Sequence, residues 1–292
     1  MHLALQTFVG QLPTAALYAL IGVGFVIVYR GTRVLNFAQG TLALLGGYLF
    51  YSIAVSAHVP FWPAVVLSVV ASMLLGASIY SLMLRPLLGE TAILLVMLTI
   101  ALNIILGALD LILWGGATRF VNVPGAKTIL HFPEGVSITA LDIAVVISVA
   151  AVLTAFGVLL KWSRFGSHMR AAAENPLLAT YRGINVSTLA AMTWAIATAG
   201  AGLAGVIYGA TNGLAPSAGN ALGFAAFPAV ILGGLDSVGG ALIGSVILAE
   251  IQGFAVSYLG GRYSDVVGYL VLLLVLIISP TGLFGSREIA RL

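Results

Sequence analysis

Long apolar segments alternate with short polar connections along almost the whole chain. The sequence contains nine such segments. A helix that crosses a bilayer needs roughly 20 apolar residues, and eight of the nine are long enough to cross alone. The pattern predicts an all-α polytopic integral membrane protein, a single transmembrane domain over residues 1–292 with about eight to ten transmembrane segments. The nine segments are Phe8–Tyr29, Asn36–Ala57, Phe61–Leu84, Ala92–Trp114, Thr139–Leu160, Ser187–Ala210, the short Gly223–Leu235, Val238–Tyr258 and Tyr263–Pro280.

Composition strengthens this prediction and narrows the classes of function. The chain is 61% hydrophobic and 7% charged, whereas soluble domains have about 25% charged residues, so a water-soluble fold is excluded. The net charge of +3 comes from basic residues at segment ends, which is typical of membrane topology and not of nucleic-acid binding. Because the chain has no cysteine, disulfides and thiolate metal sites are excluded.

The distribution of Lys and Arg predicts the orientation of the segments. If the polar connection Lys161–Val186 is cytoplasmic, nine of the twelve basic residues lie on the cytoplasmic side, as the positive-inside rule requires. This orientation places the C-terminus in the cytoplasm and the connection Gly115–Ile138 outside. The nine are Arg30, Arg33, Arg85, Lys161, Arg164, Arg170, Arg182, Arg287 and Arg291, and the other three are Arg119, Lys127 and Arg262.

The connection Lys161–Val186 carries five of the 21 charged residues and has a readable shape. Good helix formers run through Met169–Glu174, and Pro176 suits the first position of a second helix that Asn175 caps and Gly183 ends. Two short helices with a bend favour a docking surface on the aqueous side. The alternative is that the basic residues only set the topology, as in most basic loops between spans.

An internal repeat joins the second and seventh segments. Residues 35–47 and 222–234 share six of thirteen residues at a constant offset of 187. An odd number of crossings separates the copies, so we expect an inverted repeat, which places Gly-interrupted helices beside the substrate path. The alternative is a chance match in a chain rich in Leu, Ala and Gly. The predicted path residues are Asn36, Phe37, Gln39, Thr41, Gly46, Gly47, Phe224, Phe227, Pro228, Gly233 and Gly234.

Other small and polar residues within the segments have less specific interpretations. Gly205 and Gly209, like Gly240 and Gly244, form small-xxx-small pairs that let two helices approach closely. Asp110 and Glu250 are ionisable groups inside segments; Glu250 is as consistent with local pairing as with a role in transport. Asn36, Gln39 and Asn103 are expected to line a polar path or to join helices.

Motifs for catalysis are absent from the sequence. There is no phosphate-binding loop and no nucleophile elbow, and the four histidines, at positions 2, 58, 131 and 168, lack metal-ligand spacing. We therefore predict no catalytic residues, no metal and no cofactor in this chain. If ATP drives its function, another subunit must bind the nucleotide.

Four stretches resemble one family of transport proteins: TAALYALIGVGFVIVYRGTRVLNFAQGTLALLGGY (14–48), RFGSHMRAAAENPLLATYRGINV (164–186), AFPAVILGGLDSVGGALIGSVI (226–247) and ISPTGLFG (278–285). The element Asn36-Phe37-Ala38-Gln39-Gly40 is similar to the family's Asn-Phe-Ala-His-Gly, with Gln in place of His. The family is the permease subunit of bacterial ABC importers for branched-chain amino acids, the shorter of its two permease types.

This resemblance implies a location, partners and contact residues. It implies a multi-pass protein of the inner membrane, in the lipid bilayer, with no nucleic-acid partner. The implied partners are a second, homologous permease, two cytoplasmic ATPases that bind ATP-Mg, and an extracytoplasmic substrate-binding protein. The cytoplasmic coupling loop 161–186 would contact an ATPase through Arg170, Ala173, Glu174, Asn175 and Gly183.

Alternatives remain open from the sequence. Relatives of this kind also carry amides and urea, and a stand-alone channel or secondary carrier for small neutral solutes would need no docking loop. The predicted path has neutral polar groups and no fixed charge, which suits a zwitterionic aliphatic amino acid. A helix N-terminus at Asn36 or Gly223 is expected to meet its carboxylate.

Overall fold

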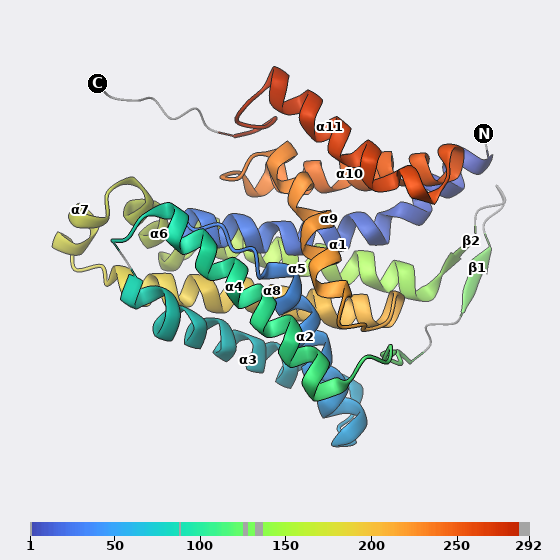
Figure 1. Ribbon diagram of the computed structural model, residues 1–292, viewed down its shortest axis with the longest axis horizontal. Helices are drawn as coiled ribbons and strands as arrows, with labels where there is room; N and C mark the ends of the chain where they lie inside the picture. The colour runs from blue at the N-terminus through green and yellow to red at the C-terminus, as the bar shows by residue number, and fades with distance from the viewer. Residues whose placement is uncertain (1, 88, 125–127, 132–136, 286–292) are drawn as a thin grey trace. The chain divides into compact units, whose positions relative to one another are not determined.

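The computed structural model describes residues 2–87, 89–124, 128–131 and 137–285, so Lys127, Arg287 and Arg291 lie outside the described residues. Within these ranges, seven helices are long and apolar enough to cross a membrane (Figure 1). They are α1 (His2–Thr32), α3 (Phe61–Ile79) with its continuation to Leu87, α4 (Ala92–Trp114), α5 (Ala140–Trp162), α8 (Val186–Thr211), α10 (Val238–Leu259) and α11 (Ser264–Ile278) with the preceding turn Gly261–Tyr263.

Shorter elements connect these helices. They are α2 (Gln39–Tyr51), α6 (Arg164–Glu174), α7 (Pro176–Tyr181), α9 (Ala218–Gly233) and an antiparallel hairpin of β1 (Ile129–His131) and β2 (Ser137–Thr139). The prediction of an all-α polytopic membrane protein is confirmed. The hairpin lies in the connection between α4 and α5.

Helix α2 is shorter than the predicted span Asn36–Ala57. The side-chain Oδ1 of Asn36 accepts the backbone N–H of Ala38 at 3.1 Å, and such a local bond competes with helix formation. The α-helix therefore begins at Gln39, and after Tyr51 it widens into a π-helical turn, Ser52–Ser56. Of the eight predicted single crossings, this is the one that does not correspond to one of the seven long apolar helices.

Helix α9 begins earlier than the sequence pattern predicts. It starts at Ala218, directly after Pro216 and Ser217, so Gly223 lies inside the helix. The expectation of a helix N-terminus at Asn36 or Gly223 is therefore wrong, because the two helices begin at Gln39 and Ala218. The helix ends at Gly233, and Gly234 follows with φ +108°, a conformation that glycine adopts without a steric penalty.

The described contacts divide the chain into two compact units. Unit 1 comprises Met1–Val26, Pro124–Ala150 and Phe224–Leu292, and unit 2 comprises Ile27–Val123 and Ala151–Gly223. In unit 1, Gly240 and Gly244 of α10 lie directly against the backbone at Gly233 and Ala229 of α9. The tail closes on the same helix end, since the N–H groups of Leu283 and Phe284 donate to the carbonyls of Leu232 and Gly233.

Unit 2 is built on close backbone contact between α2 and α8. Gly46 lies against Gly202, and Gly47 against Gly205, whose missing side chain leaves room for the carbonyl of Ala43. The close approach of these backbones aligns the two helices along a seam of small residues, as is typical of helix packing in membranes.

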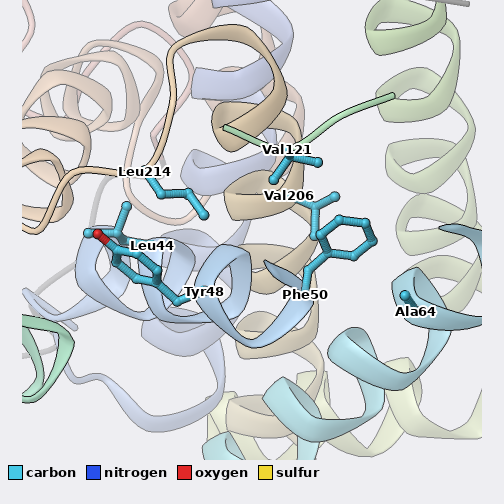
Figure 2. Packing of buried hydrophobic residues seen from close by; sticks show 7 residues of the cluster. All are labelled: Leu44, Tyr48, Phe50, Ala64, Val121, Val206 and Leu214. Carbon is cyan, nitrogen blue, oxygen red and sulfur yellow. The ribbon is translucent and has the colours of Figure 1, made fainter. Parts of the chain in front are cut away.

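A buried apolar cluster closes one end of this seam (Figure 2). Leu44, Tyr48 and Phe50 of α2 pack with Val206 of α8, and Gly209 leaves room there for the side chains of Val121 and Leu214. The ring of Tyr48 also stacks on Trp114, with centroids 4.9 Å apart. The cluster thus fixes α2 and the end of α4 against α8.

The seam predicts different effects for two glycine substitutions. A Cβ at position 205 would clash with the carbonyl of Ala43, so Gly205→Ala is expected to destabilise the protein by about 1–3 kcal/mol, the usual cost of overpacking. Gly157 in α5 has nothing within 4 Å of its Cβ position, so Gly157→Ala is expected to be neutral or stabilising. Thermal unfolding of the purified variants measures both effects. Equal melting temperatures for the two would contradict the packing described here.

Candidate functional site

The connection between α5 and α8 forms two short helices, and each helix start is capped by a side chain. Ser163 Oγ accepts the N–H of Gly166 at 3.1 Å, Asn175 Oδ1 accepts that of Leu178 at 3.0 Å, and Asn185 Oδ1 accepts that of Thr188 at 3.0 Å. Gly183 follows α7 with φ +80°. The predicted shape of two helices with a bend at Pro176 is confirmed, and the caps make it a defined structure.

Helix α7 presents an apolar surface that the sequence analysis missed. Leu177, Leu178 and Tyr181 are 71%, 61% and 85% exposed. Clustered apolar side chains on an otherwise polar connection are typical of an interaction surface. The run Pro-Leu-Leu inside a charged loop could have indicated this surface. The sequence-based prediction relied on basic and capping residues, and these side chains are neither.

The five residues predicted to couple to an ATPase have different surroundings. Glu174 is exposed and Ala173 is half-buried. Arg170 donates to the carbonyl of Leu160 at 2.6 Å and so ties α6 to the C-terminal end of α5. Asn175 and Gly183 shape the two ends of α7. Contact with a partner stays a prediction for all five.

Two sets of hydrogen bonds between neutral groups join the start of α2 to neighbouring helices of unit 2. Asn36 Nδ2 donates to Gln39 Oε1 at 2.9 Å, and Gln39 Nε2 donates to the carbonyl of Ala197 in α8 at 3.3 Å. Two residues further along α2, the hydroxyl of Thr41 donates to Asn103 Oδ1 in α4. Asn103 Nδ2 in turn donates to Asn220 Oδ1 in α9 at 2.5 Å. Three of the predicted path residues therefore take part in these two sets of hydrogen bonds, which we together call the polar network.

A cavity of about 480 Å³ adjoins the end of this network. Its polar lining is uncharged and its apolar lining comes mainly from α4. The lining residues are Asn103, Ile104, Gly107, Ala108, Leu111, Gly116, Pro216, Ser217 and Asn220. Of these residues, only Asn103 was predicted from the sequence. Pro216, Ser217 and Asn220 lie between two predicted segments, and the others, in or just after α4, are apolar or small and carry no signal of their own.

The other predicted path residues have packing roles within their own units. In unit 2, Phe37 is half-buried and Gly46 and Gly47 face α8. In unit 1, Phe227 lies against Phe25 with ring centroids 5.7 Å apart, Pro228 is buried, and Phe224 is half-exposed. Gly233 and Gly234 meet the backbones of Gly240 and Gly285. The inverted relation of the two copies stays a prediction.

Two carboxyl groups inside membrane spans are buried. Asp110 in α4 and Glu250 in α10 have no hydrogen-bond partner among the described residues. A buried carboxyl group without a partner is costly and is a functional-site candidate by default. The described residues contain no group of three or more His, Asp or Glu side chains that could hold a metal ion.

Comparison with known proteins gives consistent matches over nearly the whole chain. The family model described as branched-chain amino acid transport system / permease component matches residues 8–276. LivH of Escherichia coli K12, a high-affinity branched-chain amino acid transport system permease protein, is 30% identical over 98% of this chain and 97% of its own length. BraD of Pseudomonas aeruginosa, which carries the same description, gives the same values. A probable LivH of Methanocaldococcus jannaschii is 30% identical over 94% of this chain and 91% of its own. No solved structure matches.

The polar network predicts the effect of removing one hydroxyl. Thr41→Val takes away the donor to buried Asn103 Oδ1 and is expected to destabilise the protein by about 1–3 kcal/mol. Thr193→Val is the matched control, because the buried hydroxyl of Thr193 donates to Leu189 of its own helix. Its loss is expected to cost clearly less. Thermal unfolding compares the two, and a control that loses as much as Thr41→Val would refute the assignment.

Proposed function

The chain belongs to the family of permease components of branched-chain amino acid transport systems, and on this premise we propose that it forms the translocation path of an ATP-driven importer. It is a multi-pass inner-membrane protein and a transport subunit, not an enzyme. The proposed substrates are branched-chain amino acids or closely related neutral amino acids. The proposed partners are a second, homologous permease, two cytoplasmic ATPases that bind ATP-Mg, and an extracytoplasmic binding protein.

The capped pair of helices α6 and α7 is the observation that supports docking of an ATPase. The sequence has no phosphate-binding loop, so the energy of ATP hydrolysis must enter from another subunit. Leu177, Leu178 and Tyr181 offer an apolar contact surface, and Glu174 adds an exposed charge beside it. We define these four residues as the coupling surface.

Contacts within unit 2 provide a route from the coupling surface to the polar network. Arg170 ties α6 to the end of α5, and Asn185 caps α8 directly after the loop. Helix α8 in turn packs on α2 through Gly202 and Gly205, and α2 carries Thr41, which bonds Asn103. A displacement of the loop therefore moves helices that hold the network, as in transport by rocking of rigid bundles.

The character of the polar network favours a solute without net charge. Its side chains are amides and a hydroxyl, and none of the described residues that line the adjoining cavity is charged. Neutral groups of this kind suit a zwitterion or an amide. Buried Asp110 and Glu250 are the observation that favours the alternative of an ion-coupled carrier, because such carriers use intramembrane carboxyl groups.

An added charge in α6 tests the docking proposal. Ala173→Arg places a long cation beside the coupling surface and is expected to reduce both ATP-driven uptake and stimulation of the ATPase by about tenfold or more, while the protein still folds and inserts. His168→Arg is the control, since His168 is exposed on another face of the same helix. If uptake and ATPase stimulation survive Ala173→Arg, the assigned docking surface is wrong.

Reconstitution distinguishes the importer from the carrier. In proteoliposomes that contain both permeases and the ATPases, leucine uptake is expected to require ATP and the binding protein. Exchanging the binding protein for a compatible relative is expected to shift substrate preference, because one methylene changes affinity in an apolar pocket by only ~1–3 kcal/mol. Saturable, gradient-driven uptake by this chain alone would instead establish a secondary carrier.

A further inference from the structure

We propose that the cavity between α4 and the start of α9 is a substrate-binding site, in which Asn103 and Asn220 hold the polar end of an aliphatic amino acid. The inference rests on the proposed transport function and adds a location and named contacts. Three observations support it: the cavity, the hydrogen bond between buried Asn103 and exposed Asn220 at its end, and the apolar stripe on α4.

The position of the cavity along α4 fits a route from the surface to the middle of the membrane. Helix α4 runs from Ala92 to Trp114, so Asn103 is at its midpoint and Gly116 lies just beyond its end. At a rise of 1.5 Å per residue, the lining from Asn103 to Gly116 extends over roughly 20 Å. The positive-inside rule places the Trp114 end outside. The amide pair therefore lies near the bilayer midplane, where many transporters bind substrate.

Polar and apolar residues line different parts of the cavity. Ile104, Ala108 and Leu111 are spaced at i, i+4 and i+7, so they form one apolar stripe on α4. Among the described residues, no atom outside the backbone of α4 itself lies within 4 Å of the Cβ position of Gly107, which leaves open space beside this stripe. Asn103, Ser217 and Asn220 supply the polar groups. A branched aliphatic side chain fits the stripe, and the ammonium and carboxylate groups fit the polar end.

The amide pair has hydrogen-bonding capacity left for a ligand. Asn103 is only 9% exposed; its Oδ1 accepts from Thr41 and its Nδ2 donates to Asn220. A side-chain amide carries two N–H donors, so each of the two asparagines retains donors beyond this bond. Asn220 also lies in the first turn of α9, and the N-terminal end of a helix favours a carboxylate.

Thiol labelling tests this site directly, because the chain contains no cysteine. Ile104→Cys introduces a thiol into the cavity lining, and Ile105→Cys is the matched control, an exposed neighbour that does not line the cavity. Phe120→Cys gives an exposed reference outside the cavity. The full transporter is reconstituted and treated with a membrane-impermeant thiol reagent from the outside, with either ligand-free or leucine-loaded binding protein.

The expected pattern is specific to a water-accessible substrate site. Cysteine at 104 is expected to react. Leucine-loaded binding protein is expected to slow the reaction by about tenfold relative to the ligand-free binding protein, which corresponds to a tenfold smaller fraction of unoccupied sites. Cysteine at 105 is expected to react slowly in both conditions, and cysteine at 120 equally fast in both. Ala108→Cys repeats the test if the variant at 104 does not assemble.

Two results would overturn the site. If cysteines at 104 and 108 do not react, the cavity is filled by lipid or by the second permease. If they react but leucine gives no protection, substrate does not occupy it. ATP-driven uptake by the cysteine-free parent is measured in the same preparation, so retained uptake with no protection rejects the site and leaves the transport function standing.

A second variant tests the role of the amide. In the Ile104→Cys background, Asn220→Ala is expected to raise the leucine concentration for half-maximal protection by about tenfold, the effect of one lost hydrogen bond to a charged group. Asn212→Ala is the control, since the side chain of Asn212 is exposed and donates to the neighbouring Thr211. Equal protection in both variants would show that Asn220 does not contact the substrate.

Discussion

The close contact of α2 with α8 is the constraint on which unit 2 depends. In a bilayer the lipid tails are as apolar as leucine side chains, so helices associate through packing and hydrogen bonds and not through the hydrophobic effect. The pairs Gly46–Gly202 and Gly47–Gly205 remove the side chains that would hold the two backbones apart. Once α2 is fixed by this seam, Gln39 reaches α8 and Thr41 reaches α4.

The polar groups of unit 2 divide into satisfied and unsatisfied sets. The amides of Asn36, Gln39 and Asn103 all have partners, which matches the rule that polar groups out of water must be bonded internally. Asp110, on the same helix as Asn103, has none among the described residues. The network therefore gives structure without fixed charge, whereas the carboxyl group is left for a role that structure alone does not require.

The sequence predicted features that depend on local chemistry and missed those that depend on tertiary contact. Hydrophobic length located α4 to the residue, and cap preferences located the start of α7 at Asn175 and Pro176. The hydrophobic pattern gave the wrong starts for α2 and α9. Asn36 accepts the N–H of Ala38 and delays the start of α2, and α9 begins at Ala218, before its apolar run. Asn220 was missed because its importance arises from α4, 117 residues away in sequence.

The small residues of the seam also bear on how such a unit can move. A helix interface built from glycine has no interlocked side chains to disengage, so small shifts along it break few contacts. The polar bonds at its edge are different, because each side-chain bond lost in the membrane leaves a donor or acceptor that needs a new partner. Movement along the seam is therefore limited by the bond of Gln39 to the carbonyl of Ala197 in α8. The bonds of Asn103 to Thr41 and to Asn220 limit in the same way the movement of α4 relative to α2 and α9. If the proposed site binds substrate, a solute that offers replacement bonds at Asn220 lowers the second of these limits, so that binding and movement are coupled at one pair of amides.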